Sequence, residues 1–205
     1  MDPKAILNKA KNHTPVILGS KEFKKFAILL PLIEKDSETH VLFEVRSHHM
    51  RRQPGDICFP GGKIEGDDPS AKAAAIRETT EELGIQEEDL EDVHPLDYIV
   101  SPFGMIVYPF AGYISKPAAD IQPNPEEVRE VFTVPLSFFM KTEPRVHYVN
   151  FQAQPEEDFP YELIAGGRNY DWRTRQVEEY FYLYEDKVIW GLTASVLAHF
   201  VEMIS

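Results

Sequence analysis

The chain has 205 residues, of which 43% are hydrophobic, and its formal net charge is −13 at pH 7. A chain of this length can bury a sizeable core, so we expect residues 1–205 to form a single domain. The net charge argues against a nucleic-acid-binding protein, which needs a basic face to contact phosphates. Cys58 is the only cysteine and has no possible disulfide partner within the chain, so a reducing compartment is the simplest setting.

Targeting and membrane segments are not expected from this sequence. The first residues have no long apolar core of the kind found in signal peptides. The longest apolar run, residues 26–33, is far too short to cross a bilayer. We therefore expect no membrane partner, and the cytoplasm is the predicted location.

The predicted elements alternate irregularly between helices and strands. A short helix is expected at about residues 3–11, a second at 135–140 and a last one at about 189–204. Apolar runs and alternation predict strands at residues 26–33, 40–46, 98–100, 105–114, 128–134, 146–151 and 179–184. Residues 86–92 read as a solvated charge run, and residues 154–175 fit no element. This order predicts an α/β fold with a mixed sheet covered by helices.

One further helix follows a Gly-Gly turn and has the clearest boundaries. Asp68 is suited to the N-cap, Pro69 to the first helical position and Gly84 to the residue just beyond the end. The helical period places Ile76 and Leu83 on one face. The same period gathers Glu78, Glu81 and Glu82 on the opposite face.

This acidic group is electrostatically unfavourable where it stands. Like charges at i and i+4 repel by about 0.2–0.5 kcal/mol, and carboxylates near a helix C-terminus also oppose the macrodipole. An ordinary solvated face is the alternative explanation for such a group. The nearby glycine turn and the basic side chains of Lys63 and Arg77 favour a metal site, because Mg²⁺ and Mn²⁺ bind carboxylate oxygens and relieve the repulsion.

The spacing of these residues resembles the Nudix box, G-x5-E-x7-R-E-U-x-E-E-x-G-U, in which U is aliphatic. The matching positions are Gly62, Asp68, Arg77-Glu78, Glu81-Glu82 and Gly84-Ile85. The chain departs from the pattern at three points. Asp68 replaces the first glutamate, eight residues instead of seven precede Arg77, and Thr79 takes an aliphatic position.

A second motif resembles the coenzyme A diphosphatase branch of the same family, R-[SA]-x3-R-x3-G-x3-F-P-G-G. It comprises Arg46-Ser47, Arg51, Gly55 and Phe59-Pro60-Gly61-Gly62. The Leu-Leu-Thr that usually precedes the first arginine reads Leu42-Phe43-Glu44 here. The two motifs together cover residues 42–85, about a fifth of the chain.

The resemblance implies a Nudix-type α/β/α sandwich and a metal-dependent hydrolase. It implies that Glu78 and Glu82 bind Mg²⁺ or Mn²⁺, with Glu81 as a third ligand or a water-orienting group. The Gly62 carbonyl would add an oxygen ligand, and Arg77 would orient Glu78. Glu127 is the candidate general base, although a plain surface acid explains it equally well.

The same resemblance implies a coenzyme A-like substrate, cleaved to 3′-phosphoadenosine 5′-phosphate and 4′-phosphopantetheine. Arg46, Arg51 and Lys63 are the candidate substrate-binding residues, since a guanidinium binds phosphate oxygens bidentately. A Nudix hydrolase of ADP-ribose or of dinucleoside polyphosphates is one alternative. A catalytically inactive ligand-binding Nudix domain is another, and a homodimer is compatible with either.

Overall fold

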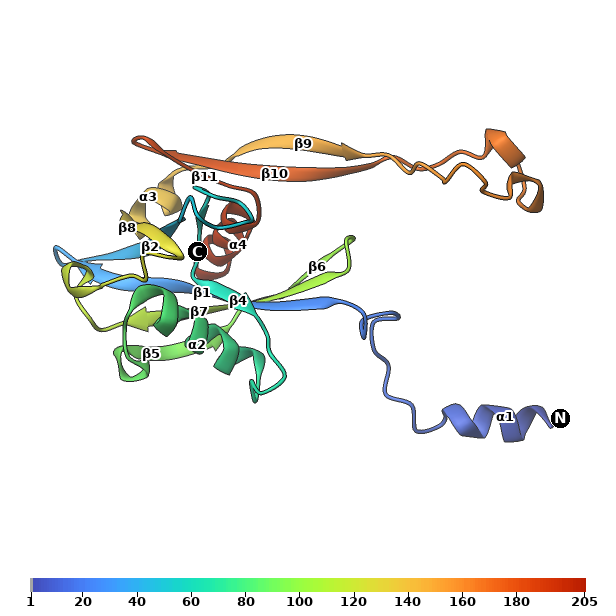
Figure 1. Ribbon diagram of the computed structural model, residues 1–205, viewed down its shortest axis with the longest axis horizontal. Coiled ribbons are helices and arrows are strands. Elements are labelled where there is room, and N and C mark those ends of the chain that lie inside the picture. Colours follow the sequence, from blue (N-terminus) through green and yellow to red (C-terminus); the bar gives the residue numbers. More distant parts are fainter. Residues whose placement is uncertain (1) are drawn as a thin grey trace.

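The computed structural model describes residues 2–205, and its centre is an eight-stranded mixed sheet. Strands β1 (Lys24–Lys35) and β7 (Met105–Ile114) run parallel through the middle, and β2 (Glu38–Arg46) lies antiparallel to β1 (Figure 1). The remaining strands of this sheet are β3 (Ile57–Cys58), β4 (Gly61–Lys63), β5 (Leu90–Pro95), β6 (Ile99–Ser101) and β8 (Val128–Pro135). Apart from β1 with β7, the paired strands are antiparallel.

Helices cover both faces of this sheet, which is why β1 is apolar on both sides. Helix α2 (Ala71–Leu83) packs its small residues against Ala27 and Leu29. On the other face, Leu30 joins Val41 and Phe43 in a larger core. This core includes residues of α3 (Leu136–Lys141) and α4 (Gly191–Ile204). The predicted α/β fold with a mixed sheet is confirmed.

A three-stranded sheet forms a second layer beyond α4. Its order is β11 (Lys187–Trp190), β10 (Arg175–Tyr184) and β9 (Arg145–Phe151). The long β9–β10 hairpin extends away from the body, and its end carries the 3₁₀ turns Tyr161–Leu163 and Gly167–Asn169 (Figure 1). These turns account for part of the segment that the sequence left unassigned. Helix α1 (Pro3–Ala10) also projects from the body and buries none of its residues.

Two predicted elements needed correction. The charged segment after α2 contains a 3₁₀ turn, Glu87–Asp89, and then enters β5, in which Val93 is the one buried side chain. The last helix begins at Gly191, because Ile189 and Trp190 pair with β10 as a strand.

A further 3₁₀ turn spans Ala118–Asp120. Within residues 2–205, the helices are too short or too polar to cross a bilayer.

Candidate active site

Helix α2 is fixed at both ends by residues of its own sequence. Its N-cap is Ser70, whose Oγ accepts a hydrogen bond from the Ala73 amide at 3.1 Å. The prediction of Asp68 as N-cap was therefore wrong. Gly84 ends the helix with a φ of 63°, as predicted, and a Cβ at this position would overlap the Gln122 carbonyl.

The acidic residues of α2 differ in how deeply they are buried, so the solvated face considered as an alternative does not describe all three. Glu82 is only 4% exposed, whereas the Glu81 side chain is 57% exposed. Thr79 is buried on the same side of the helix as Glu82. The reason is that α2 packs closely over β4, whose glycines leave room for the carboxylates between helix and sheet.

The carboxylates of Glu82 and Glu78 each contact one glycine of β4. The backbone N–H of Gly61 donates a hydrogen bond to Glu82 Oε2 at 2.7 Å. The Glu78 carboxylate lies directly over Gly62, where a Cβ would overlap it. Burial raises the pKa of Glu82 to about 9, with a further contribution from the charge of Glu44. Burial also raises the pKa of Glu78, and Arg77 partly offsets this effect.

Arg77 connects the loop before α2 to the acidic residues on it. Its Nε and Nη2 bind the two carboxylate oxygens of Asp68 at 3.0 and 3.1 Å. Its Nη1 contacts Glu78 at 2.9 Å and Glu81 at 3.4 Å. Arg77 thus forms ion pairs with both Asp68 and Glu78, and such charge-assisted contacts are stronger than neutral hydrogen bonds. The extra residue between Asp68 and Arg77 leaves this bidentate pair intact.

A cleft of about 430 Å³ brings carboxylates and cations together. Glu78, Glu82 and Glu127 supply its acidic groups, and its basic residues are Arg46, Arg52 and Lys63. Gly61 and Gly62 also line it. Arg51, a predicted substrate-binding residue, is exposed and does not line this cleft, whereas its neighbour Arg52 does. Glu81 does not line the cleft either.

The position of Glu127 is defined by two contacts. Its Oε2 accepts a hydrogen bond from Asn124 Nδ2 at 3.2 Å. Its backbone carbonyl accepts a hydrogen bond from the Ser47 amide at 2.7 Å, which joins this loop to the start of the arginine loop, residues 46–55. Glu127 also lines the cleft, together with Glu78 and Glu82.

Glu44 is a residue near the site that sequence reasoning did not single out. It is 1% exposed, its Oε1 accepts a hydrogen bond from Cys58 Sγ at 3.1 Å, and its Oε2 has no partner. The pKa of Glu44 is raised to about 7, mainly by burial and to a smaller extent by the charges of Glu127 and Glu78. Glu44 is an acidic residue within an apolar strand, and it stands where the Leu-Leu-Thr motif before Arg46 has its threonine. This departure from the motif is the signal that could have identified Glu44 from the sequence. The same burial raises the pKa of Cys58, whose thiol is thus a hydrogen-bond donor rather than a nucleophile.

The side chains present suit a hard divalent cation. Among residues 2–205, no three His, Cys, Asp or Glu side chains are already gathered closely enough to hold a metal ion. Nevertheless, Glu78 and Glu82 line one cleft, both with raised pKa values, beside the unpartnered oxygen of buried Glu44. A cation at this place would compensate the crowded negative charge, and carboxylate oxygens are the ligands that Mg²⁺ prefers.

The fold and the cleft define a class of protein. Helix-borne carboxylates held against a glycine strand, and facing cations across a cleft, form a site suited to the hydrolysis of phosphate anhydrides. Comparison with known proteins agrees with this class. Residues 24–152 match the family model of the NUDIX domain, and the chain belongs to the Nudix family of hydrolases. Nudix hydrolases generally use divalent metal ions and act on small nucleotide substrates.

The chain is also similar to individual Nudix proteins and to solved structures of this fold. The peroxisomal coenzyme A diphosphatase NUDT7 of Mus musculus is 38% identical over 135 residues, 66% of this chain and 56% of that protein. The chain thus matches little more than half the length of this relative. The Nudix hydrolase NudL of Photorhabdus laumondii is 31% identical over 178 residues, 87% of this chain and 83% of its own. A MutT/nudix family protein from Enterococcus faecalis has the same fold, with a TM-score of 0.50, 15% identity and coverage of 100% of this chain and 70% of that chain.

Proposed function

We propose that this Nudix hydrolase cleaves the diphosphate bond of coenzyme A or its derivatives. The products would be 3′-phosphoadenosine 5′-phosphate and 4′-phosphopantetheine. The observation that carries the proposal is the arginine loop, which places Arg46 and Arg52 in the same cleft as Glu78 and Glu82. The similarity to a mouse coenzyme A diphosphatase supports the same substrate class.

The proposed metal ligands are Glu78 and Glu82, with the Gly62 carbonyl as an additional oxygen. A bound Mg²⁺ or Mn²⁺ would neutralise the diphosphate and lower the pKa of the attacking water. Arg77 keeps the Glu78 carboxylate directed over β4 through its 2.9 Å contact. Glu81 lies outside the cleft and contacts Arg77 at 3.4 Å. Its proposed contribution is therefore to hold Arg77 or to orient water.

Glu127 is the proposed general base. It lines the cleft together with Glu78 and Glu82, and its carboxylate keeps one oxygen free when the other accepts a hydrogen bond from Asn124. A carboxylate in this position can take the proton of the water that attacks phosphorus. Arg46 and Lys63 would bind the phosphate oxygens and stabilise the charge that develops on them. Arg52 joins them, in place of the sequence candidate Arg51.

A substrate panel with Mg²⁺ or Mn²⁺ present tests the proposal. Coenzyme A, ADP-ribose and diadenosine polyphosphates are incubated separately, and their products are resolved by chromatography. We expect coenzyme A to give the largest kcat/KM, and hydrolysis in heavy-oxygen water to place the label on a phosphate product. Release of a thiol from an acyl derivative without diphosphate cleavage would indicate a thioesterase.

The panel also separates the alternative functions. Preferred cleavage of ADP-ribose or of a dinucleoside polyphosphate would overturn the coenzyme A assignment and leave the Nudix hydrolase class intact. Tight nucleotide binding without turnover under any metal condition would indicate an inactive binding domain. The intact pair Glu78 and Glu82 argues against that last outcome, since such a domain has no need of both carboxylates.

A further inference from the structure

The cleft with the carboxylates continues into two neighbouring depressions. A depression of about 240 Å³ shares Arg46, Gln53 and Leu192 with the cleft. It shares Asp56, Ile57 and Trp190 with an outer depression of about 470 Å³. Because each shares lining residues with the next, the three depressions adjoin one another between α2 and the β10–β11 hairpin, and together they make up one groove.

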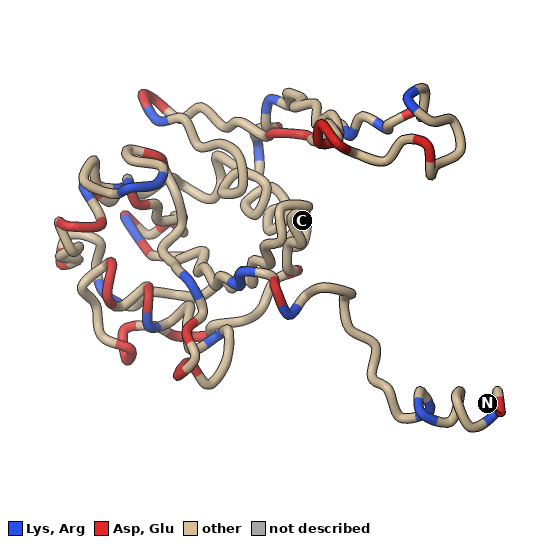
Figure 2. The backbone as a smooth tube through the Cα atoms, turned by 45° about the vertical axis from the view of Figure 1, so that its right-hand side comes forward, with Lys and Arg blue, Asp and Glu red and all other residues tan. Residues whose placement is uncertain are grey.

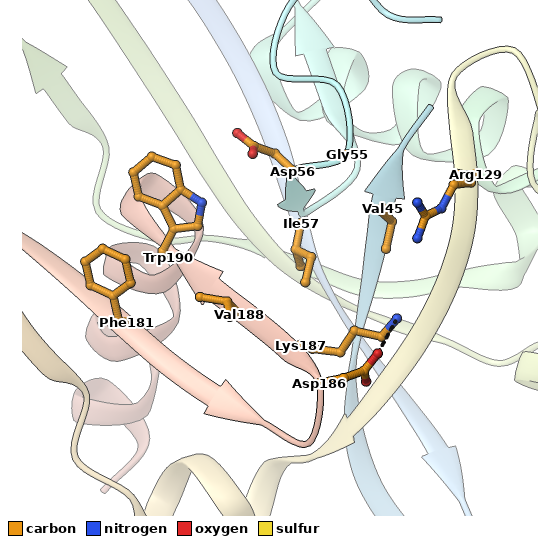
Figure 3. Close-up of a pocket in the computed structure, with 10 residues that line it drawn as sticks. All are labelled: Val45, Gly55, Asp56, Ile57, Arg129, Phe181, Asp186, Lys187, Val188 and Trp190. Carbon is orange, nitrogen blue, oxygen red and sulfur yellow. Dashed lines mark ion pairs between the residues drawn. The ribbon is translucent and has the colours of Figure 1, made fainter. Parts of the chain in front are cut away.

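Apolar side chains from two elements form part of the outer end of this groove. Figure 3 shows Phe181, Val188 and Trp190 of the β10–β11 hairpin on one side, with Val45 and Ile57 of the main sheet opposite them. The rings of Phe181 and Trp190 are stacked, with centroids 5.8 Å apart. Trp190 is 42% exposed and Val188 is 45% exposed, so both present uncovered apolar surface.

The basic side chains at this outer end are already paired with acids. Lys187 Nζ lies 2.9 Å from Glu130 Oε1, and it also contacts Asp186 at 4.0 Å (Figure 3). Arg129 lies 3.5 Å from Glu130, and Nη1 of the same guanidinium is hydrogen-bonded to His48 at 2.8 Å. Asp56 also lines this end. The outer end therefore has no surplus positive charge for a phosphate, in contrast to the cleft, where Arg46, Arg52 and Lys63 are the proposed phosphate-binding residues.

We infer that the outer end of the groove binds the acyl group of an acyl-pantetheine arm. This inference rests on the proposed function. A coenzyme A derivative has a charged nucleotide on one side of its diphosphate and, on the other, a neutral chain ending in a thiol or thioester. With the diphosphate at α2, the neutral chain matches a groove end without surplus positive charge, and a hydrocarbon acyl group matches Phe181, Val188 and Trp190. The protein would therefore favour acylated over free coenzyme A.

The test compares kcat and KM for coenzyme A and octanoyl-coenzyme A in three variants. Val188→Asp places a charge at the outer end, and Trp190→Ala removes the stacked indole. Val149→Asp is the matched control, because Val149 is 43% exposed in the same three-stranded sheet and lines none of the three depressions. Circular dichroism and thermal melts establish that each variant is folded.

We expect Val188→Asp to lower the ratio of kcat/KM for octanoyl-coenzyme A to that for coenzyme A by about 10- to 100-fold, mainly through KM, as small changes in apolar pockets do. Trp190→Ala should shift the ratio in the same direction, and Val149→Asp should leave it unchanged. An unchanged ratio in both groove variants, with coenzyme A still cleaved, would overturn the inference alone. A change in discrimination between coenzyme A and dephospho-coenzyme A would place the nucleotide there instead. If wild type cleaves neither coenzyme A substrate, the proposed function itself fails.

Discussion

Glu82 combines a buried position with a backbone hydrogen bond that fixes one of its oxygens. We expect Glu82→Gln to lower kcat by about 10²-fold or more, since loss of a metal-binding group has effects of that order. The folded state should be as stable as wild type or more stable at pH 8, because the substitution removes a buried carboxylate with a raised pKa. Steady-state kinetics at saturating Mg²⁺ and a thermal melt provide the two measurements.

The control for this substitution is Glu88→Gln, which changes an exposed acid outside the cleft. It should retain wild-type kcat. Full turnover by wild type in excess chelator would contradict a metal-dependent mechanism, whatever the variants show.

Arg52 and Arg51 provide a test of neighbouring residues in the arginine loop. Arg52 lines the cleft and Arg51 does not. Arg52→Ala should lower kcat/KM for coenzyme A by about 10- to 100-fold, as expected for a lost charged hydrogen bond to phosphate. Arg51→Ala should change it much less. The reverse order would mean that the loop rearranges when substrate binds and that the motif position, Arg51, is the phosphate ligand.

At the residue scale, the sequence predicted which acidic and basic side chains lie close together on α2, but not how deeply each is buried. Glu78, Glu82 and Arg77 were found from their spacing along one helix, and the structure brings them together beside β4. The depth of Glu82 depends on how closely that helix approaches Gly61 and Gly62, which helical periodicity alone does not determine. Glu44 lies on another strand, so its proximity is a tertiary property.

At the scale of elements, the ends of α2 differ in how well the sequence defines them. A residue with φ of 63° favours glycine, so Gly84 was a clear C-terminal signal. The segment before the helix contains both Asp68 and Ser70, each able to cap, and Asp68 is engaged by Arg77 instead. Strand β5 was missed because it buries only Val93, which leaves almost no alternation to detect.

Gly84→Ala is a test of this helix end. Any other residue there is strained by the positive φ, and the added Cβ would overlap the Gln122 carbonyl. We expect the free energy of unfolding to fall by about 1–3 kcal/mol, as for residues forced into the left-handed region, measured by urea denaturation. Gly66→Ala is the control, because a Cβ at Gly66 meets no atom within 4 Å. Equal effects at both positions would contradict this explanation.

At the scale of the whole molecule, the acidic charge is spread along the chain rather than gathered in one segment (Figure 2). Basic positions are interspersed with the acidic ones, and Arg46, Arg52 and Lys63 supply local positive charge to the cleft of a protein with net charge −13. A local site can therefore bind an anionic substrate despite the overall charge. The homodimer and the cytoplasmic location stay predictions.

The buried carboxylates also predict how metal-free stability depends on pH. Burial raises the pKa of Glu82 from an ordinary 4.5 to about 9, so the folded state retains a proton that the unfolded state has already lost. The folded state therefore binds more protons, and stability falls as pH rises from about 7 to about 9. His40, whose pKa is lowered by burial, acts in the opposite direction, but mainly near and below the ordinary histidine pKa of 6.5.

Thermal melts at pH 7, 8 and 9 with chelator present measure this effect, with Glu82→Gln as the comparison. We expect the melting temperature of wild type to fall more steeply with pH than that of the variant, since the variant lacks the titrating group. Added Mg²⁺ should raise the wild-type melting temperature most at pH 9, because binding needs the ionised carboxylate and stabilises only the folded state. Parallel pH profiles for the two proteins would show that Glu82 is ionised in the folded protein well below pH 7. In that case its burial would be compensated by hydrogen bonding, chiefly from the Gly61 amide.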